Sequence, residues 1–393
     1  MAEPVAEPSA EPSPDELPLA DQFRQFAAAV EGDGAVTYAV ICRGVAEDPE
    51  LLALMEQAPL AQRRPNLLLA AVHFLLLGGV AHPLAAHYDT VRLVTGTTRA
   101  PPPPGADPVA ELVADFRDFC LTKRAELLPL IAVRSTQTNE VGRCAALLPA
   151  LCAIAASYGE GQPISLLDLG TSAGLNLLFD RYAYTYRQRA DGAVLEAGAD
   201  GSPVRLDCTV RGELAALPPL RPPPVAARAG LDRQPIDPDS EDAARWLLAC
   251  QWPDNLPRFI RLRAALAIAR TTTGRPAIFE GDLVDDLDAV AATIDDSRPL
   301  VVFHSWVAAY LSEGRQGELV RAVQALGATR LVHHLYAEAP NETRGLPTPP
   351  SPHPRPSSDL ATALVHIGPG GAPPVRLADM HPHGIWLQWW APA

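Results

Sequence analysis

The chain has 393 residues, of which 48% are hydrophobic, so it is long enough to bury a sizeable core and to hold two domains. Its formal net charge of −14 argues against nucleic acid as a partner, because no basic field would attract the phosphates. The six cysteines include no C-x-x-C pair, so neither a disulfide framework nor a zinc site is expected. No secretory signal is visible, and we expect a cytoplasmic protein.

The first part of the sequence reads as helical. Residues 1–18 repeat Ala-Glu-Pro and are expected to be a disordered tail, because they bury too little apolar surface to offset their ordering entropy. Helical spacing of apolar residues then continues without a strand-like run, which predicts an all-helical domain over 19–160. Residues 67–86 are apolar, but histidines, glycines and a proline interrupt them. They predict a buried helix, and no membrane span is expected.

From Pro163 onward, short apolar runs alternate with helical patterns. This alternation predicts a doubly wound, mostly parallel α/β sheet of the Rossmann-like type over 161–393. Residues 183–222 are interpreted as an insertion that carries a hairpin, with the polar, Gly-rich stretch 189–202 as its loop. One long helix is expected over 241–269. The expected core strands are 164–169, 225–232, 276–280, 299–304 and 329–336. The expected hairpin strands are 184–186 and 204–210. A closing antiparallel pair is expected at 361–367 and 384–390.

The stretch that follows the first strand fits two different motifs. Gly170-Thr-Ser-Ala-Gly174, the glycine loop, matches the G-x-S-x-G nucleophile elbow, in which Ser172 would be the nucleophile. Together with Asp168 it also matches D-x-G-x-x-x-G, a strand that runs into a nucleotide-binding loop. The elbow needs an oxyanion loop from an earlier strand, whereas everything before Asp168 reads as helical. The carboxylate of Asp168 would also oppose an oxyanion, so the nucleotide loop is favoured.

A nucleotide loop would be completed by acids at the ends of the next two strands. Asp232 follows the second strand and is the candidate for the ribose hydroxyls, provided that 183–222 is an insertion. Asp282 and Leu283 follow the third strand, where adenine would bind. Loop glycines allow a ligand to approach the backbone closely, and Asn176 begins the next helix. His304 ends the fourth strand and is the candidate catalytic residue, with Trp306 nearby for substrate.

The segment before the first strand is unusually polar for its surroundings. On a helix, Asn139 and Arg143 would share one face, so Asn139, Glu140 and Arg143 are candidate substrate-binding residues. Helix caps and one ion pair would explain the same residues. The histidine pairs at 333–334 and 381–383 have no carboxylate or cysteine at ligand spacing, and no metal is expected there.

Four blocks of sequence carry a resemblance to a known family: Arg-Arg-Pro-Asn-Leu-Leu-Leu-Ala-Ala-Val-His (63–73), Thr-Gln-Thr-Asn-Glu-Val-Gly-Arg-Cys (136–144), Leu-Leu-Asp-Leu-Gly-Thr-Ser-Ala-Gly-Leu-Asn (166–176) and Val-Val-Phe-His-Ser (301–305). The chain resembles the bacterial family catalogued as domain of unknown function 2332, over nearly its whole length. Its C-terminal part also looks like class I methyltransferases, with Asp168, Gly170 and Gly174 at their first glycine motif. Asp232 and Asp282 fit the later acidic positions loosely, and no Asn-Pro-Pro-Tyr-type motif stands at strand four.

The resemblance implies an S-adenosylmethionine-dependent methyltransferase-like protein with a small-molecule substrate. Two other functions remain open: a non-catalytic nucleotide-fold scaffold, and a serine hydrolase that uses Ser172. The absence of G-x-G-x-x-G makes a nicotinamide dinucleotide a weaker candidate than S-adenosylmethionine.

Overall fold

The structure is a computed structural model of the chain that describes residues 17–98, 105–352 and 361–390. Most of the expected tail at 1–18 lies outside the described residues. The chain forms two compact units, Met1–Thr138 with Glu241–Ile260 (the helical unit) and Asn139–Ser240 with Arg261–Ala393 (the sheet unit). The structural boundary therefore lies at residue 138 rather than at 160, and residues 241–260 return to the first unit.

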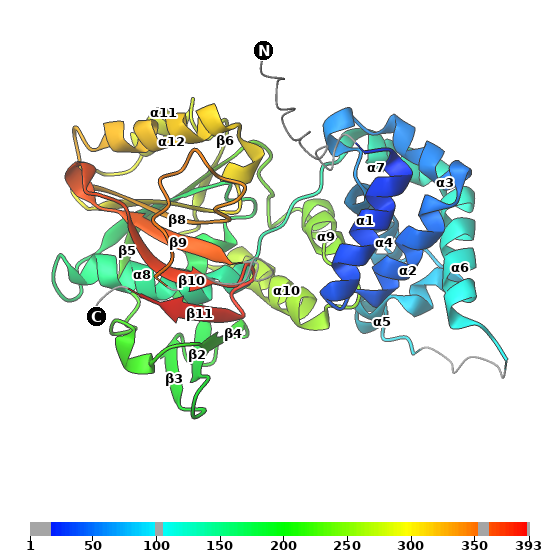
Figure 1. Cartoon of the computed structure of the whole chain (residues 1–393), viewed down its shortest axis with the longest axis horizontal. Coiled ribbons are helices and arrows are strands. Elements are labelled where there is room, and N and C mark those ends of the chain that lie inside the picture. The colour runs from blue at the N-terminus through cyan, green and yellow to red at the C-terminus, as the bar shows by residue number, and fades with distance from the viewer. Residues whose placement is uncertain (1–16, 99–104, 353–360, 391–393) are drawn as a thin grey trace, which may run out of the picture. The chain divides into compact units, whose positions relative to one another are not determined.

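Among its described residues the helical unit contains helices joined by turns and loops, and no strand (Figure 1). Its centre is α4, which is buried around its whole circumference and explains the apolar run that begins at Leu67. None of the described helices combines the length and apolarity that a membrane span requires. The elements are α1 (Leu19–Gly32), α2 (Val36–Ala46), α3 (Pro49–Leu54), η2 (Met55–Gln57), η3 (Leu60–Gln62), α4 (Pro65–Leu77), η4 (Pro83–His87), α5 (Asp89–Thr95), α6 (Pro108–Thr122), α7 (Arg124–Val133), α9 (Glu241–Ala249) and the start of α10 (Leu256–Thr271).

In the sheet unit, eleven described strands form one sheet in the order β3-β2-β4-β11-β10-β9-β8-β7-β1-β5-β6. The strands are β1 (Ile164–Leu169), β2 (Ala183–Gln188), β3 (Val194–Gly198), β4 (Arg205–Val210), β5 (Val225–Asp232), β6 (Ala277–Glu280), β7 (Leu300–Ser305), β8 (Val332–Glu338), β9 (Thr362–Ile367), β10 (Val375–Met380) and β11 (Trp386–Trp389). The helical elements are η5 (Val141–Arg143), α8 (Cys144–Ala156), η6 (Leu175–Arg181), η7 (Leu214–Ala216), the rest of α10, α11 (Leu287–Ala291), η8 (Ala308–Tyr310), α12 (Glu313–Leu326) and η9 (Pro369–Gly371).

Five neighbouring strands, β6-β5-β1-β7-β8, are all parallel. The chain passes from β1 outward to β5 and β6, and then crosses to β7 on the other side of β1. The winding direction therefore reverses between β1 and β7, and ligands of open parallel sheets bind outside the strand ends at such a point. The expected mixed α/β architecture with a large, mostly parallel sheet is confirmed.

The hairpin within 183–222 forms between other strands than expected. β2 and β4 are parallel neighbours, and the antiparallel partner of β2 is β3, within a stretch that we interpreted as a loop. β3 lies at the sheet edge with partly exposed residues, so it lacks the apolar alternation that marks a half-buried strand. β4 pairs with β11, and this insertion therefore extends the main sheet.

Two further expectations were wrong. The strands expected to close the chain as a pair, β9 and β11, are separated by β10, which is antiparallel to both. β10 was missed because Arg376 and Asp379 look like turn residues, whereas they bond to each other and Asp379 is fully buried. The single helix expected over 241–269 is divided into α9 and α10, with Pro253 in the connection.

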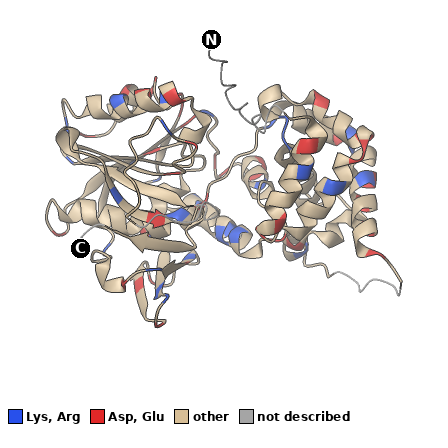
Figure 2. Ribbon diagram, in the orientation of Figure 1, with Lys and Arg blue, Asp and Glu red and all other residues tan. Residues whose placement is uncertain are grey.

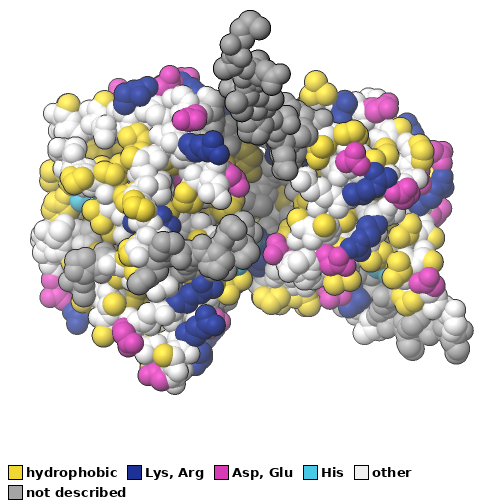
Figure 3. Space-filling model, in the orientation of Figure 1, with side chains coloured by type: hydrophobic (Ala, Val, Ile, Leu, Met, Phe, Trp, Pro, Cys, Tyr) yellow, Lys and Arg dark blue, Asp and Glu magenta, His cyan; other side chains and the backbone are white. Residues whose placement is uncertain are grey.

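Acidic and basic residues are interspersed along the ribbons of both units (Figure 2). The molecular face in Figure 3 likewise shows Lys and Arg side chains beside Asp and Glu side chains. Many are paired locally, as Arg24 is with Asp21 and Glu47 at 2.7 Å each. Exposed pairs of this kind contribute little to stability, so the fold depends on the buried elements described above.

Candidate ligand site at the glycine loop

The glycine loop leaves the end of β1 and is hydrogen-bonded to the end of β5. The N–H groups of Gly170 and Thr171 donate to the Leu231 carbonyl, at 2.8 and 3.4 Å. The Ser172 N–H donates to Asp232 Oδ2 at 2.8 Å. These amides have acceptors within the protein, so a ligand at the loop would be recognised mainly by side chains.

The far end of the glycine loop is held from the segment before α8. The Leu175 N–H donates to Asn139 Oδ1 at 3.2 Å, and the Gly174 N–H donates to the Thr171 carbonyl at 2.8 Å. Asn139 is buried, and by accepting the Leu175 N–H it caps the start of η6 from outside the helix. Asn176, also buried, accepts the thiol of Cys144 through Oδ1 at 3.3 Å.

The two glycines of the loop are needed for packing. Both have left-handed backbones, with φ of +72° at Gly170 and +71° at Gly174. A Cβ on Gly170 would lie 2.5 Å from Val307 Cγ2, and one on Gly174 would lie 2.9 Å from Ile278 Cδ1. We expected a ligand to occupy the space at Gly170, whereas the side chain of Val307 occupies it.

Asp168 lies beneath this loop with 3% of its surface exposed. Thr171 Oγ1 donates to Asp168 Oδ2 at 3.0 Å. Burial, and to a lesser extent the charge of Asp232, raise the pKa of Asp168 to about 8, against the hydrogen bond from Thr171 and the charge of Arg143. A buried carboxyl group that holds its proton near neutral pH beside a second acid is a common feature of ligand and catalytic sites.

Asp232 and Asp282 differ in their surroundings. The two carboxylate oxygens of Asp232 accept the N–H groups of Ser172 and Gln234, both at 2.8 Å. Asp282 instead pairs with Arg233 and Arg315, at 2.5 and 2.6 Å. Asp232 therefore organises the loop at the switch point, whereas Asp282 joins an arginine network.

The lowered pKa of Asp282 agrees with an ionised carboxylate that pairs with arginines. Partial burial alone would raise it, but hydrogen bonds from Arg233 and from the amides of Val284 and Asp285 outweigh burial and lower it to about 2. Leu283 is buried in the cluster that includes Leu287. The structure thus assigns Leu283 to the core and does not place Asp282 in the pocket described below.

The segment that contains Asn139, Glu140 and Arg143 is not one continuous helix face. Glu140 precedes the 3₁₀ turn η5, and its Oε1 accepts the Gly142 N–H at 2.9 Å. Its carboxylate also lies 3.4 Å from Arg261 and 3.4 Å from His383. Asn139 and Arg143 were expected to share one helix face, but the turn starts only after Glu140, so Asn139 lies outside it.

Arg143 connects three parts of the sheet unit. Its Nε donates to the Pro382 carbonyl at 3.0 Å, and its Nη1 donates to the Ser305 carbonyl at 3.0 Å. Its guanidinium carbon lies 5.9 Å from the ring centroid of Trp306. Trp306 has a left-handed φ of +56° and donates its indole N–H to Thr362 Oγ1 at 3.0 Å. Both residues therefore organise the turn that follows β7.

His304 lies on the other face of the sheet from Asp168. Opposite residues of a ladder share a face, and His304 pairs with Leu169, whereas Asp168 pairs with Phe303. Leu169 packs in the same cluster as residues of α11 and α12, which run along one face of the sheet in Figure 1. The ring of His304 is fully buried, so it is not exposed to a ligand at the glycine loop.

Both ring nitrogens of His304 are used in a buried polar cluster. Nδ1 lies 2.7 Å from Glu338 Oε1 and Nε2 lies 3.0 Å from His334 Nε2, while the ring stacks on Tyr336. Glu338 Oε1 also accepts the Val307 N–H at 3.1 Å. This cluster therefore holds the turn that fills the space at Gly170, which gives His304 a positioning role.

The neighbouring histidines of the sequence have separate environments. His333 points away from His334 and lies 2.6 Å from the Tyr158 hydroxyl and 2.8 Å from His366. Burial and the nearby His366 lower the pKa of His333 to about 3, so its ring is neutral at physiological pH. In the 381–383 stretch, the His383 N–H donates to His381 Nδ1 at 3.0 Å.

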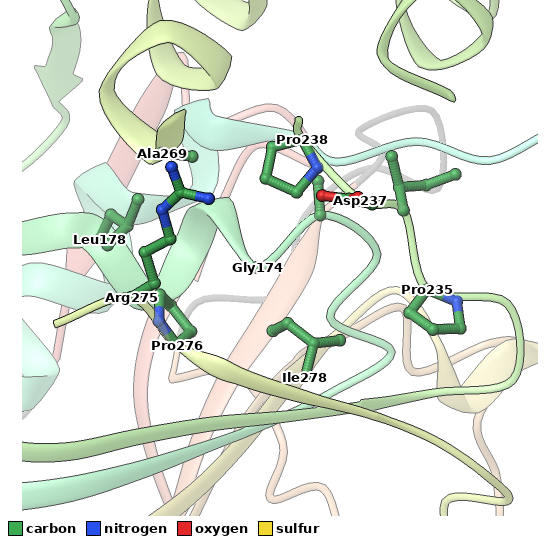
Figure 4. A pocket seen from close by; sticks show the side chains of 11 residues that line it. Gly174, Leu178, Pro235, Asp237, Pro238, Ala269, Arg275, Pro276 and Ile278 are labelled. Carbon is green, nitrogen blue, oxygen red and sulfur yellow. The ribbon is translucent and has the colours of Figure 1, made fainter. Parts of the chain in front are cut away.

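A pocket of about 330 Å³ adjoins the glycine loop. Figure 4 shows Gly174, Ile278, Pro235 and Pro238 around it, with the side chains of Arg275 and Asp237 at its border. Of the residues expected to bind the cofactor, only Gly174 lines this pocket. Its complete lining is Ala173, Gly174, Leu178, Pro235, Ile236, Asp237, Pro238, Ala269, Arg275, Pro276 and Ile278.

Sequence reasoning missed the pocket walls and the cluster around His304. The stretch Pro235–Pro238 directly follows the second core strand, and its two prolines mark a rigid connection where ligands of such sheets bind. Glu338 ends a core strand and has an apolar neighbour on each side, which is a signal for a buried carboxylate. Neither signal was used.

The chain belongs to a bacterial protein family. The family described as "Uncharacterized protein conserved in bacteria (DUF2332)" matches residues 20–389, nearly the whole chain. The comparison with curated proteins finds no match. The membership agrees with the resemblance carried by the four sequence blocks and leaves the chemistry of the site to be argued from its geometry.

The contact between Gly170 and Val307 can be tested by a double substitution. Gly170→Ala should destabilise the protein by about 2–4 kcal/mol, because it adds a left-handed alanine and a clash with Val307. Val307→Ala should recover part of that loss in the double variant by removing the clash. Urea unfolding of the two single variants and the double variant measures the coupling. Strict additivity would show that Val307 does not fill this space.

The raised pKa of Asp168 makes stability dependent on pH. The folded value of about 8 lies above the ordinary 3.8, so the folded state binds more protons between these limits. Stability should therefore fall as pH rises from about 4 to 8, by up to about 1.4 kcal/mol per pH unit from this residue. Asp168→Asn should remove that slope, which thermal unfolding of both proteins from pH 5 to 8.5 would measure. Parallel pH profiles would contradict the assignment.

Proposed function

We propose that the sheet unit binds S-adenosylmethionine and acts as a methyltransferase on a small molecule. One observation carries the proposal: β1, the middle strand of five parallel strands, ends at the switch point with Asp168 and the glycine loop. The order β6-β5-β1-β7-β8 corresponds to the 3-2-1-4-5 order of doubly wound nucleotide-binding sheets. The motif at this place is the one that resembles class I methyltransferases.

The electrostatics of the loop favour a cationic ligand. Asp232 lies close enough for its charge to raise the pKa of Asp168. A positive group placed between them would relieve this repulsion and release the proton of Asp168. S-adenosylmethionine carries two such groups, its amine and its sulfonium, so its methionine end suits these acids.

The adjoining pocket suits the other end of the same ligand. Its walls are mostly apolar, with Ile236, Ile278 and three prolines among them, and a flat adenine ring gains contact with such side chains. Asp237 and Arg275 add polar groups for ring nitrogens or ribose hydroxyls. A volume of about 330 Å³ lies at the lower end of the range for small-molecule sites.

The proposal changes the roles expected for two residues. His304 is buried on the opposite face of the sheet, so it would position the turn at Val307 instead of exchanging protons with substrate. Asp282 is occupied by two arginines, so adenine recognition passes to the pocket beside Gly174. The substrate acceptor has no assigned base, and a nucleophilic acceptor would suffice for methyl transfer.

The proposal predicts proton-coupled binding. Titration calorimetry at pH 7 in two buffers of different ionisation enthalpy should show S-adenosylmethionine binding with release of up to one proton. Asp168→Asn should abolish the release and weaken binding by about ten- to a hundredfold, because it removes a charged partner of the ligand.

Asp282→Asn is the matched control, since it alters an acid at a neighbouring strand end whose charge serves Arg233 and Arg315. It should bind like the parent, and circular dichroism would confirm that both variants fold. Absence of binding by the folded parent would refute the proposal and favour the scaffold function. Binding that depends on Asp282 but not on Asp168 would move the ligand to another part of the sheet edge.

One observation favours the serine hydrolase alternative. Ser172 has a left-handed φ of +53°, and nucleophile elbows place their serine on a strained turn of this kind. Against it, the amide of Ser172 is bound to the carboxylate of Asp232, whose charge would oppose an oxyanion at this turn. His304, the histidine at the nearest strand end, has both ring nitrogens engaged by Glu338 and His334.

A fluorophosphonate probe separates these alternatives. We expect no labelling of the parent protein, and we expect Ser172→Ala to bind S-adenosylmethionine within about threefold of the parent, since no ligand bond is assigned to its hydroxyl. Mass spectrometry of the treated protein provides the measurement. Stoichiometric modification of Ser172 would establish the elbow and overturn the proposed loop.

A further inference from the structure

We propose that the helical unit holds a divalent transition-metal ion between His87, Glu111 and Asp115. One ligand atom from each of these side chains lies within 4.8 Å of the other two, close enough for a single ion to contact all three. His87 Nε2 lies 3.0 Å from Asp115 Oδ2. The residues belong to a different unit from the glycine loop, so this inference does not depend on the proposed methyltransferase activity.

The three donors stand on well-anchored elements. Glu111 and Asp115 are four residues apart on α6, which places them on one face of the helix. The helix begins with Asp107, whose side chain accepts the amides of Val109 and Ala110. Helical proteins build metal sites from carboxylates and histidines that project toward one another from facing elements.

His87 comes from the end of the 3₁₀ turn η4, opposite α6. Its side chain is only 4% exposed, whereas that of Asp115 is 22% exposed and Glu111 lies at the surface. The site is therefore closed on the histidine side and open to water on the carboxylate side, which leaves coordination positions for water. An ion bound by Nε2 of His87 would take the place of the hydrogen-bonded proton between His87 and Asp115, and the neutral ring would carry its proton on Nδ1.

The donor set indicates the class of ion. One imidazole nitrogen and two carboxylates suit borderline ions such as Zn²⁺, Mn²⁺ or Fe²⁺, whereas Mg²⁺ and Ca²⁺ prefer all-oxygen sites. With both carboxylates ionised the group carries two negative charges, which a divalent ion neutralises. A Zn²⁺ ion with these three ligands would keep at least one position for water.

The same two elements contain a second histidine–aspartate pair that differs in one respect. His82 Nε2 lies 3.0 Å from Asp118 Oδ2, but His82 Nδ1 accepts the Leu84 N–H at 3.1 Å. His82 therefore donates from Nε2 and functions as a cap of η4. This pair belongs to no group of three candidate ligands among the described residues, so it is a matched control.

The experiment is calorimetric titration of the chelator-treated full chain with ZnCl₂, MnCl₂ or MgCl₂. We expect one Zn²⁺ per chain, weaker Mn²⁺ binding and no competition by Mg²⁺. His87→Asn and Asp115→Asn should each weaken Zn²⁺ binding by about a hundredfold or more, since even residues behind metal ligands cost ten- to a hundredfold. His82→Asn should bind like the parent, as should Asp118→Asn.

Co²⁺ provides a readout that does not depend on stability. Its visible absorption should appear at one equivalent in the parent and in His82→Asn and be absent in His87→Asn. Thermal unfolding in chelator would establish that all the variants are folded. The proposal is overturned if the parent binds no ion, if His87→Asn retains the Co²⁺ spectrum, or if the His82 and His87 variants lose Zn²⁺ equally, because the ion would then be held elsewhere, for example by cysteine thiols.

Discussion

The closure of the glycine loop onto β5 is the constraint on which the centre of the sheet unit depends. Three residues of the loop, Gly170, Ser172 and Gly174, adopt left-handed backbones, which is costly for the serine. The cost is offset by hydrogen bonds to Leu231 and Asp232. The turn thus joins the two strands whose ends form the candidate site, and it covers the carboxyl group of Asp168.

The close fit of the loop extends to strands on both sides. A Cβ on Gly230 of β5 would lie 2.5 Å from Thr171, so a glycine is needed there as well. On the other side Val307 fills the space at Gly170, and its amide is held by Glu338 from the end of β8. The buried cluster of Glu338 and His304 therefore acts on the loop through the turn after β7, although it lies on the opposite face from Asp168. Its role is positional, because His304 and Glu338 are buried.

Much of this arrangement could be predicted from sequence, because its signals are local. The five parallel strands are apolar runs that end in glycine or polar residues, and the glycine loop follows the first of them directly. The strands β3 and β10 could not be predicted in the same way, since β3 is half exposed at an edge and β10 contains Arg376 and Asp379. These two charges become compatible with a buried strand only because they pair with each other and with partners from other segments.

In the candidate site, too, the sequence shows where the acids lie but not which partners they meet. A carboxylate at a strand end is equally visible in sequence at Asp168, Asp232 and Asp282, yet the three have different partners. Asp282 meets Arg315, which is 33 residues away and comes from α12. Asp232 meets the amides of the glycine loop, and Asp168 meets Thr171 under that loop. Only the last two meet at this loop, where the charge of Asp232 raises the pKa of Asp168, and this effect is the basis of the proposed cationic ligand. The chemistry of the site therefore follows from the partners that each acid meets, and these partners are set by tertiary structure.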